Sequence, residues 1–249
     1  MPTSSKGITA GQLVTDIVLK DFRAAEVFRK YNIDFCCGGK MPLSMACELQ
    51  GVNEDILMEE LEHFAPVYES AKSWAVDFTI DYLINLHHTY FKNSLPVLLE
   101  YVDRFFKSHI KKFPESHELP GLVDELQTKL QKQLSYESDK LFPYIKRIHY
   151  AHSDNEVYGK LLMKTLQKVP VEDVQQHDAP LVELIFRIEE LTNSFQPPSN
   201  ACTTHKVMLQ KLEEFTGYIR QHIFIERKIL IPAAMQIERN LLEKLAETE

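Results

Sequence analysis

The sequence predicts an all-α protein, a four-helix up-down bundle preceded by a small N-terminal helical domain. Only 8 of the 249 residues are glycine, and no Asn-Gly or Asp-Gly turn joins two alternating apolar runs, as a β-hairpin would require. Four long segments instead carry apolar residues at alternating spacings of three and four, the period of an amphipathic helix. Prolines lie between these segments, where bundle loops are expected.

The predicted N-terminal domain covers residues 1–70, and the bundle covers residues 71–249. Helical periodicity extends over residues 10–33 and 41–64. Between them lies Phe35-Cys36-Cys37-Gly38-Gly39, whose paired glycines permit a tight turn. Pro66 and the polar residues that follow it interrupt the periodicity, so we expect the domain boundary near residue 70.

The predicted bundle helices are joined by loops that contain proline. Ser199 and Asn200 directly follow Pro197-Pro198 and suit the N-cap of the last helix. The four helical segments are 77–108, 120–150, 172–195 and 200–246.

The composition is that of an ordinary globular protein, with 44% apolar and 26% charged residues. A formal net charge of -8 argues against a nucleic-acid partner, because a phosphate backbone requires a basic surface. Charged residues interrupt the N-terminal segment, and no apolar run reaches the length of a membrane span. We therefore expect no signal peptide, no membrane segment and a cytoplasmic location, where the four cysteines stay reduced.

Ligand-type side chains occur inside the apolar stripes of the predicted helices. In the first segment His88 shares a stripe with Ile84 and Phe91, whereas the phase through Leu83 and His87 is less apolar. We therefore expect His88, rather than His87, to point inward. The second stripe comprises Val123, Leu126, Leu130, Gln133, Glu137, Leu141, Tyr144 and Ile148.

The third and fourth segments add further residues of this kind. His177 lies in phase with the leucines of the third segment. His222 and Glu226 lie four residues apart in the fourth segment. The fourth stripe comprises Met208, Leu212, Phe215, Ile219, His222, Glu226, Ile229 and Ala233.

Two buried glutamates need partners, because an unpaired ionised carboxylate in a protein interior costs several kcal/mol. No Lys or Arg falls on the inner stripes near Glu137 or Glu226, but His88, His177 and His222 do. Imidazole and carboxylate together bind iron, zinc or manganese. One inward histidine alone is more often a hydrogen-bonded core residue, but four convergent helices favour two metal ions bridged by carboxylates.

The paired cysteines form a second candidate site. A disulfide between Cys36 and Cys37 would strain the intervening peptide, so free thiols are expected. They could exchange with other thiols or bind sulfur or iron. Alternatively, one of them is a small buried apolar residue. Cys47 and Cys202 are expected to be structural.

Four motifs spread over nearly the whole chain resemble a known family. They are residues 31–39 (YNIDFCCGG), Leu141-Phe142-Pro143 after Glu137, residues 197–204 (PPSNACTT), and residues 222–226 (HIFIE) with the following Leu230-Ile231-Pro232. Together they resemble the iron-sulfur cluster repair di-iron proteins, also called repair of iron centres (RIC) proteins, which join a Cys-Cys domain to a hemerythrin-like domain.

The resemblance implies that His88, His177 and His222 are terminal iron ligands and that Glu137 and Glu226 bridge two non-haem irons. It implies repair of iron-sulfur clusters damaged by nitric oxide or peroxide. Damaged iron-sulfur proteins and small gases would be the partners, and nitric oxide would be bound or reduced at the diferrous site. Dimerisation through the N-terminal domain stays open. The alternatives are a hemerythrin-like oxygen or gas sensor and a metal-depleted adaptor.

Two departures from the family pattern affect the expected site. Gln133 stands where the family carries a histidine, and an amide is a weaker iron ligand. The second iron would then bind weakly, His109 would replace the missing ligand, or the site would hold one metal only. Pro180 lies beside His177 and would kink the third helix unless it falls in the first turn.

Overall fold

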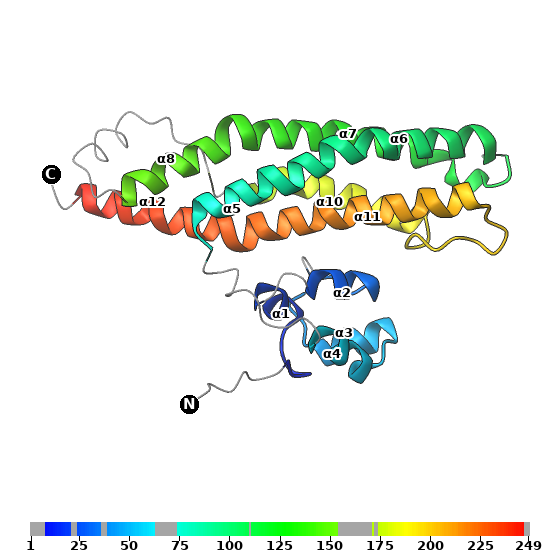
Figure 1. The fold of residues 1–249 in the computed structure, drawn as a ribbon, viewed down its shortest axis with the longest axis horizontal. Helices are drawn as coiled ribbons and strands as arrows, with labels where there is room; N and C mark the ends of the chain where they lie inside the picture. Colours follow the sequence, from blue (N-terminus) through cyan, green and yellow to red (C-terminus); the bar gives the residue numbers. More distant parts are fainter. Residues whose placement is uncertain are drawn as a thin grey trace. The chain divides into compact units, whose positions relative to one another are not determined.

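The computed structural model describes residues 8–20, 24–35, 39–62, 74–109, 111–153, 171 and 174–246. These residues are mostly helical, and the only β-type pairing among them is an isolated bridge between Leu13 and Pro42 (Figure 1). The chain divides into two compact units, Met1–Ala75 and Val76–Glu249. The predicted all-α fold is therefore confirmed.

The described residues of the N-terminal unit form four short helices where two longer helical regions were expected. The third one ends because Gly51 adopts the left-handed conformation (φ 65°), and its N–H bonds the carbonyls of Cys47 and Glu48. The next helix begins after Asn53, whose side-chain oxygen accepts the Ile56 N–H at 3.2 Å. The four helices are α1 (Val14–Lys20), α2 (Ala24–Lys30), α3 (Leu43–Gln50) and α4 (Glu54–Glu62).

Thr15 holds both ends of the short segment that contains the paired cysteines. Its N–H donates to the Gly39 carbonyl at 2.8 Å, and its hydroxyl donates to the Phe35 carbonyl at 3.3 Å. A Cβ atom at Gly39 would clash with the Thr15 hydroxyl and with the Phe35 carbonyl group. This close approach requires glycine. Cys36 and Cys37 themselves lie outside the described residues.

We expect Gly39→Ala to destabilise the N-terminal unit by about 1–3 kcal/mol, the cost of inserting a methyl group into filled space. Urea denaturation combined with amide hydrogen exchange in α1 would measure this loss. Gly11→Ala is the matched control, because a Cβ at exposed Gly11 meets no atom within 4 Å. Equal stabilities of the two variants would contradict the close-contact argument.

The described residues of the bundle unit form long helical segments that run along one another (Figure 1). Its elements are α5 (Val76–Tyr82), η2 (Leu83–His88) and α6 (Thr89–His109), then η3 (Pro114–Glu118), α7 (Leu119–Tyr136), η4 (Glu137–Leu141) and α8 (Phe142–Ser153), then α10 (Val174–Leu191), and finally α11 (Thr203–Ile225), η6 (Glu226–Leu230) and α12 (Ile231–Ala246).

The long segments pack side by side along the bundle. α10 lies against α7, α11 against α6, and α12 against α8. Every residue of the predicted second stripe, from Val123 to Ile148, is at most 7% exposed. Among the described helices, none is long and apolar enough to cross a membrane.

Within the described residues, three bundle segments contain a π-helical turn, and each turn starts or ends at a candidate metal ligand. η2 ends at His88, η4 begins at Glu137, and η6 begins at Glu226. A π-turn takes up one residue more than an α-helical turn, and such turns are frequent at functional sites. The three turns therefore mark one level of the bundle as specialised.

The π-turns shift the buried face by one residue and correct two sequence predictions. Leu83 and His87 are fully buried and Ile84 is half-buried, so the expectation that His87 points outward is wrong. In the last segment, Ala234 is fully buried instead of Ala233 for the same reason.

Pro180 lies inside α10, past its first turn, and the helix continues through it to Leu191. Pro96 likewise lies inside α6. Proline therefore ends neither helix, although each proline removes one backbone donor.

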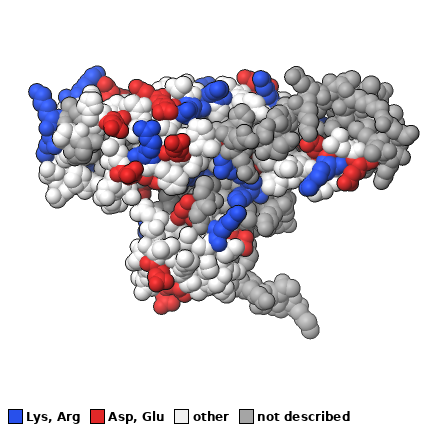
Figure 2. All heavy atoms as spheres, turned by 180° about the vertical axis from the view of Figure 1, so that it is seen from behind, with Lys and Arg blue, Asp and Glu red and all other residues white. Residues whose placement is uncertain are grey.

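Charged side chains of both signs are interspersed over the bundle face in Figure 2. On this face, the described Lys and Arg residues lie next to Asp and Glu residues.

Candidate metal centre

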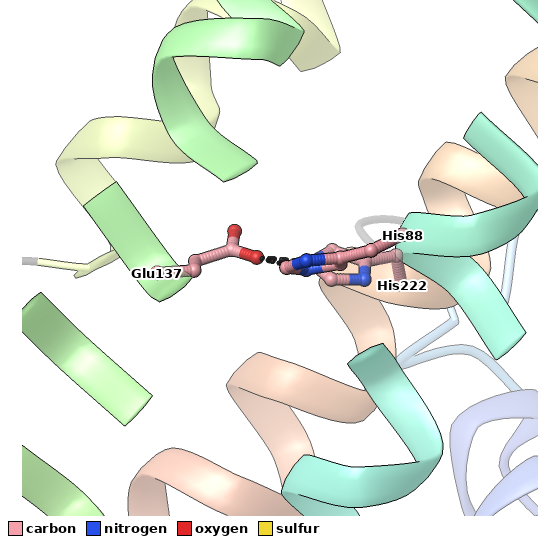
Figure 3. A group of neighbouring side chains, drawn as sticks. All are labelled: His88, Glu137 and His222. Carbon is pink, nitrogen blue, oxygen red and sulfur yellow. Dashed lines mark hydrogen bonds and ion pairs between the residues drawn. The ribbon is translucent and has the colours of Figure 1, made fainter. Parts of the chain in front are cut away.

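His88, Glu137 and His222 meet in the interior of the bundle (Figure 3). Each offers one ligand atom, and these atoms lie within 4.8 Å of one another. The Glu137 Oε2 atom is 2.8 Å from His88 Nε2 and 3.1 Å from His222 Nε2. The three residues come from η2, η4 and α11, so the bundle fold is what brings them together.

Glu137 is charged despite being buried. Burial by itself would raise its pKa, but the charges and hydrogen bonds of His222 and His88 lower the pKa of this carboxyl group to about 2. Burial also opposes protonation of His222, yet the Glu137 carboxylate raises the pKa of this imidazole above its ordinary value. When no metal is bound, the two imidazoles therefore hydrogen-bond the carboxylate oxygen that would otherwise bind a cation.

Glu226 is fully buried, and neither carboxyl oxygen has a hydrogen-bond partner. Burial, followed by the charges of Glu137 and Asp178, raises its pKa well above the usual range. A buried carboxyl group without a partner is costly and needs a functional explanation. A bound cation supplies that explanation, because a carboxylate that binds metal no longer lacks a partner.

Further unpartnered atoms of ligand type lie on the helical segments that contain Glu137 and Glu226. They are Glu137 Oε1, His222 Nδ1 and Gln133 Oε1, all buried. Carboxylate, imidazole and amide oxygen are all ligands for iron, zinc or manganese. Together with His88, these residues therefore fit a metal ion, and the three π-turns end at His88 or begin at Glu137 and Glu226.

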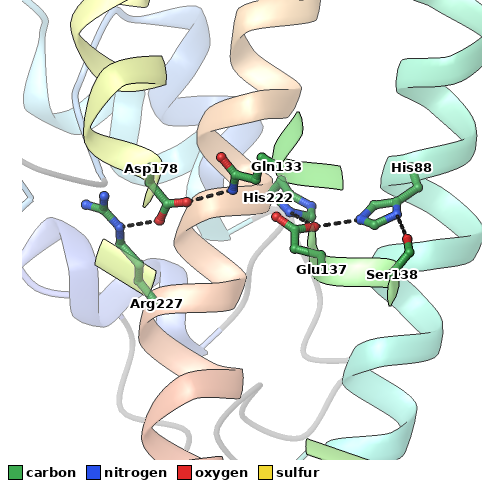
Figure 4. A network of polar contacts seen from close by, with 7 residues as sticks. All are labelled: His88, Gln133, Glu137, Ser138, Asp178, His222 and Arg227. Atoms are coloured by element: carbon green, nitrogen blue, oxygen red, sulfur yellow. Dashed lines mark hydrogen bonds and ion pairs between the residues drawn. The ribbon is translucent and has the colours of Figure 1, made fainter. Parts of the chain in front are cut away.

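Asp178 is a fully buried residue of this region that the sequence analysis missed (Figure 4). Its Oδ1 accepts the Gln133 Nε2 donor at 2.6 Å, and its Oδ2 accepts Arg227 Nε at 2.6 Å. Burial raises the pKa of Asp178, and Arg227 opposes that rise. Arg227 lies off the predicted inner stripe and is half-buried, but its guanidinium nevertheless reaches the buried Asp178.

Gln133 is 7% exposed and faces the interior, as its stripe predicted. Its amide nitrogen is fixed on Asp178, and its amide oxygen has no partner. A glutamine held in this way can offer a neutral oxygen to a cation.

His109 does not replace the expected histidine ligand. α6 runs without interruption from Thr89 to His109, which places His109 about 30 Å along the helix from His88. There its Nε2 atom is 3.1 Å from the Cys202 Sγ atom, at the start of α11. This histidine therefore belongs to the far end of the bundle.

His87 adds a neutral imidazole beside the candidate ligands. Its ring centroid lies 5.5 Å from that of His222. The backbone of Tyr218 is near, but neither ring nitrogen of His87 is in hydrogen-bond geometry. Burial first, and then the charge of His222, lower the pKa of His87 to about 3.

The described side chains include four of the seven candidate residues. His88, Glu137, His222 and Glu226 lie at the level of the π-turns. The side chain of His177 lies outside the described residues, as do Cys36 and Cys37. The His177 backbone belongs to α10, directly before Asp178.

Comparisons with known proteins agree with this cation-binding chemistry. Residues 79–234 match the family model described as the hemerythrin HHE cation binding domain, and residues 10–65 match ScdA_N, a domain of unknown function (DUF542). The chain is 28% identical over 226 residues to the iron-sulfur cluster repair protein YtfE of Escherichia coli O81 (strain ED1a). The aligned region covers 90% of this chain and 96% of that protein.

The protein of the same name from Escherichia fergusonii is 27% identical over the same shares of both chains. These comparisons confirm the resemblance inferred from the sequence motifs. Because the first match covers more than half of the sequence, the chain belongs to the hemerythrin HHE cation-binding family.

Proposed function

We propose that this chain is a di-iron protein that repairs iron-sulfur clusters damaged by nitrosative or oxidative stress, or supplies iron to them. The observation that carries the proposal is Glu226, a fully buried carboxyl group without a hydrogen-bond partner, near Glu137 in a cation-binding domain. The relatives named iron-sulfur cluster repair proteins cover 90% of the chain and support the choice of iron.

In this proposal His88, His177 and His222 are terminal ligands, and Glu137 and Glu226 bridge the irons. Glu137 already contacts both His88 and His222 through one oxygen, while its other oxygen is unpartnered. Bound ferrous ions would supply one-electron chemistry and an exchangeable cation. Loading would require the His222 imidazole to give up the proton that the Glu137 carboxylate stabilises, so iron affinity should fall as pH decreases.

Gln133 favours iron supply over tight storage. Its amide is a weaker ligand than imidazole, so one of the two irons would be held less firmly. A less firmly held iron can be passed to a damaged cluster, and the thiols of Cys36 and Cys37 are the groups we propose for that transfer.

The surroundings of the site suit a small neutral gas such as nitric oxide. The His88 ring stacks on Phe142 with centroids 5.6 Å apart, and the His222 ring lies 5.8 Å from that of Phe91. Such apolar walls exclude charged competitors more than a diatomic gas. We therefore include nitric oxide binding at the reduced site in the proposal.

The test combines iron content with a repair assay. Protein purified without oxygen should contain two irons, coupled antiferromagnetically in the ferric Mössbauer spectrum, and should restore activity to a nitrosylated iron-sulfur enzyme. Cys36→Ser should keep the iron and slow the repair, with Cys47→Ala as control. Absence of iron after anaerobic reconstitution would favour the adaptor, and a stable oxygen adduct without repair would favour the gas sensor.

Replacing Gln133 with histidine should strengthen the weaker metal site by roughly 10–100-fold, the range typical for changes in the ligand environment. The imidazole could donate one N–H to Asp178 and offer its other nitrogen to the metal. Competition with a chromophoric chelator would measure the affinity. Gln131→His, which adds a histidine at an exposed position of the same helix, should leave it unchanged. Equal affinities in both variants would place Gln133 outside the metal site.

A further inference from the structure

Two tyrosines form a stacked pair close to the candidate metal centre. The rings of Tyr90 and Tyr218 are nearly parallel, with centroids 3.8 Å apart and planes at 16°. Tyr90 lies two residues after His88, and Tyr218 lies one helical turn before His222. Both side chains are partly exposed, so the pair lies between the interior of the bundle and its surface.

His87 connects this pair to the metal ligands. Its ring centroid lies 6.0 Å from Tyr218 and 5.5 Å from His222. The ring is fully buried and neutral, and no hydrogen bond fixes either of its nitrogens. A continuous row of aromatic rings therefore leads from a ligand, through His87, to two phenols.

Oxidation of a phenol releases a proton along with the electron, and Tyr90 has an acceptor at hand. Burial first, and then the charge of the nearby Glu214 carboxylate, raise the pKa of the Tyr90 phenol. Glu214 is partly exposed and pairs with Lys211 at 2.9 Å. A carboxylate in this position can take the phenolic proton and exchange it with water.

We propose that the Tyr90–Tyr218 pair is a redox relay that donates an electron to the metal centre during reaction with hydrogen peroxide. Reduction of one peroxide to two waters consumes two electrons and two protons. One electron comes from the tyrosine pair through His87, and the other from the reduced metals. The phenolic proton moves to Glu214, and the two protons for water come from solvent.

The relay rests on the proposed metal function and adds a protective role to it. An oxidising equivalent that stayed at the site would attack the histidine ligands. Once transferred to the tyrosine pair, it lies at the edge of the bundle, where a soluble thiol can return the electron. A purely structural role would need only the stacked rings, which phenylalanine also supplies.

The experiment uses the full chain, loaded with ferrous iron without oxygen and then mixed with hydrogen peroxide. Freeze-quench electron paramagnetic resonance should reveal a tyrosyl radical, whose lines narrow when the protein contains ring-deuterated tyrosine. In the double variant Tyr90→Phe/Tyr218→Phe the radical should fall to background, while oxidation of His88 and His222, followed by mass spectrometry, should increase. Tyr150→Phe, at an exposed position of α8, should behave as wild type.

Iron content, measured in the same samples, separates this proposal from the proposed function. Wild-type protein that binds iron and consumes peroxide without a tyrosyl radical would overturn the relay alone. Survival of the radical in the double variant would overturn it as well. Failure of the wild type to bind iron would overturn both proposals.

Discussion

Replacing Glu226 with leucine should stabilise the metal-free protein and abolish its metal binding. The carboxyl group is fully buried without a hydrogen-bond partner, so the folded protein bears its desolvation cost. An apolar side chain of similar size removes that cost, and we expect a gain of about 1–3 kcal/mol in the free energy of unfolding. Urea denaturation of the metal-free proteins and iron analysis after reconstitution would measure the two effects.

Glu238→Leu provides the matched control, with the opposite sign. Glu238 is also buried in the last segment of the bundle, but its carboxylate accepts a hydrogen bond from the Tyr144 hydroxyl. Its removal leaves a buried hydroxyl without that acceptor and should destabilise the protein. If Glu226→Leu also lost stability, Glu226 would have a structural role instead of being kept for a cation.

The opposite signs illustrate how a metal site differs from an ordinary core. Selection for stability alone would replace Glu226, because its burial without a partner favours unfolding. The π-turn that begins at this residue also departs from regular helix geometry. Both features are explained if the bundle gives up stability to hold a ligand in place.

The second stripe shows how far periodicity alone could predict the fold. Regular spacing from Val123 to Ile148 identified a buried face on which Gln133 and Glu137 interrupt apolar residues, and all of these are buried. Prediction from periodicity failed where the helix changes from the α-helical to the π-helical period. At η2 the extra residue of the π-turn buries His87 as well as Leu83, and no pattern of residue types in the sequence announces that turn.

Asp178 and Arg227 show a different limit. Each directly follows a residue that the stripes selected, His177 or Glu226, so helical phase alone placed them off the buried face. Their side chains meet because α10 and the last segment bring them together, and an ion pair between distant segments leaves no periodic signal. The sequence signal that could have identified Asp178 was chemical, because an aspartate next to a predicted metal ligand often hydrogen-bonds and orients the groups around the metal site.

Replacing Arg227 with leucine should destabilise the metal-free protein by about 3–5 kcal/mol, the usual cost of removing one partner from a buried ion pair. The Asp178 side chain is 0% exposed, so water cannot replace the lost partner. Among the described contacts, Arg227 is its one basic hydrogen-bond partner. Chemical denaturation at neutral pH would measure the change. Arg220→Leu is the control from α11, because the carboxylate of its partner Glu189 is 27% exposed, whereas that of Asp178 is 0% exposed, so this variant should lose less stability.

The pH dependence distinguishes a lost charge partner from lost packing. Without Arg227, the pKa of Asp178 should rise further above its ordinary value, because burial is then unopposed. Between the unfolded and the folded pKa, the folded variant binds more protons than the unfolded chain, so its stability falls as pH increases through that window. The deficit relative to wild type should therefore shrink as the solution becomes acidic. Adding Asp178→Asn to Arg227→Leu should restore much of the stability and remove this pH dependence, whereas an unchanged deficit in the double variant would mean that Arg227 acts mainly through packing.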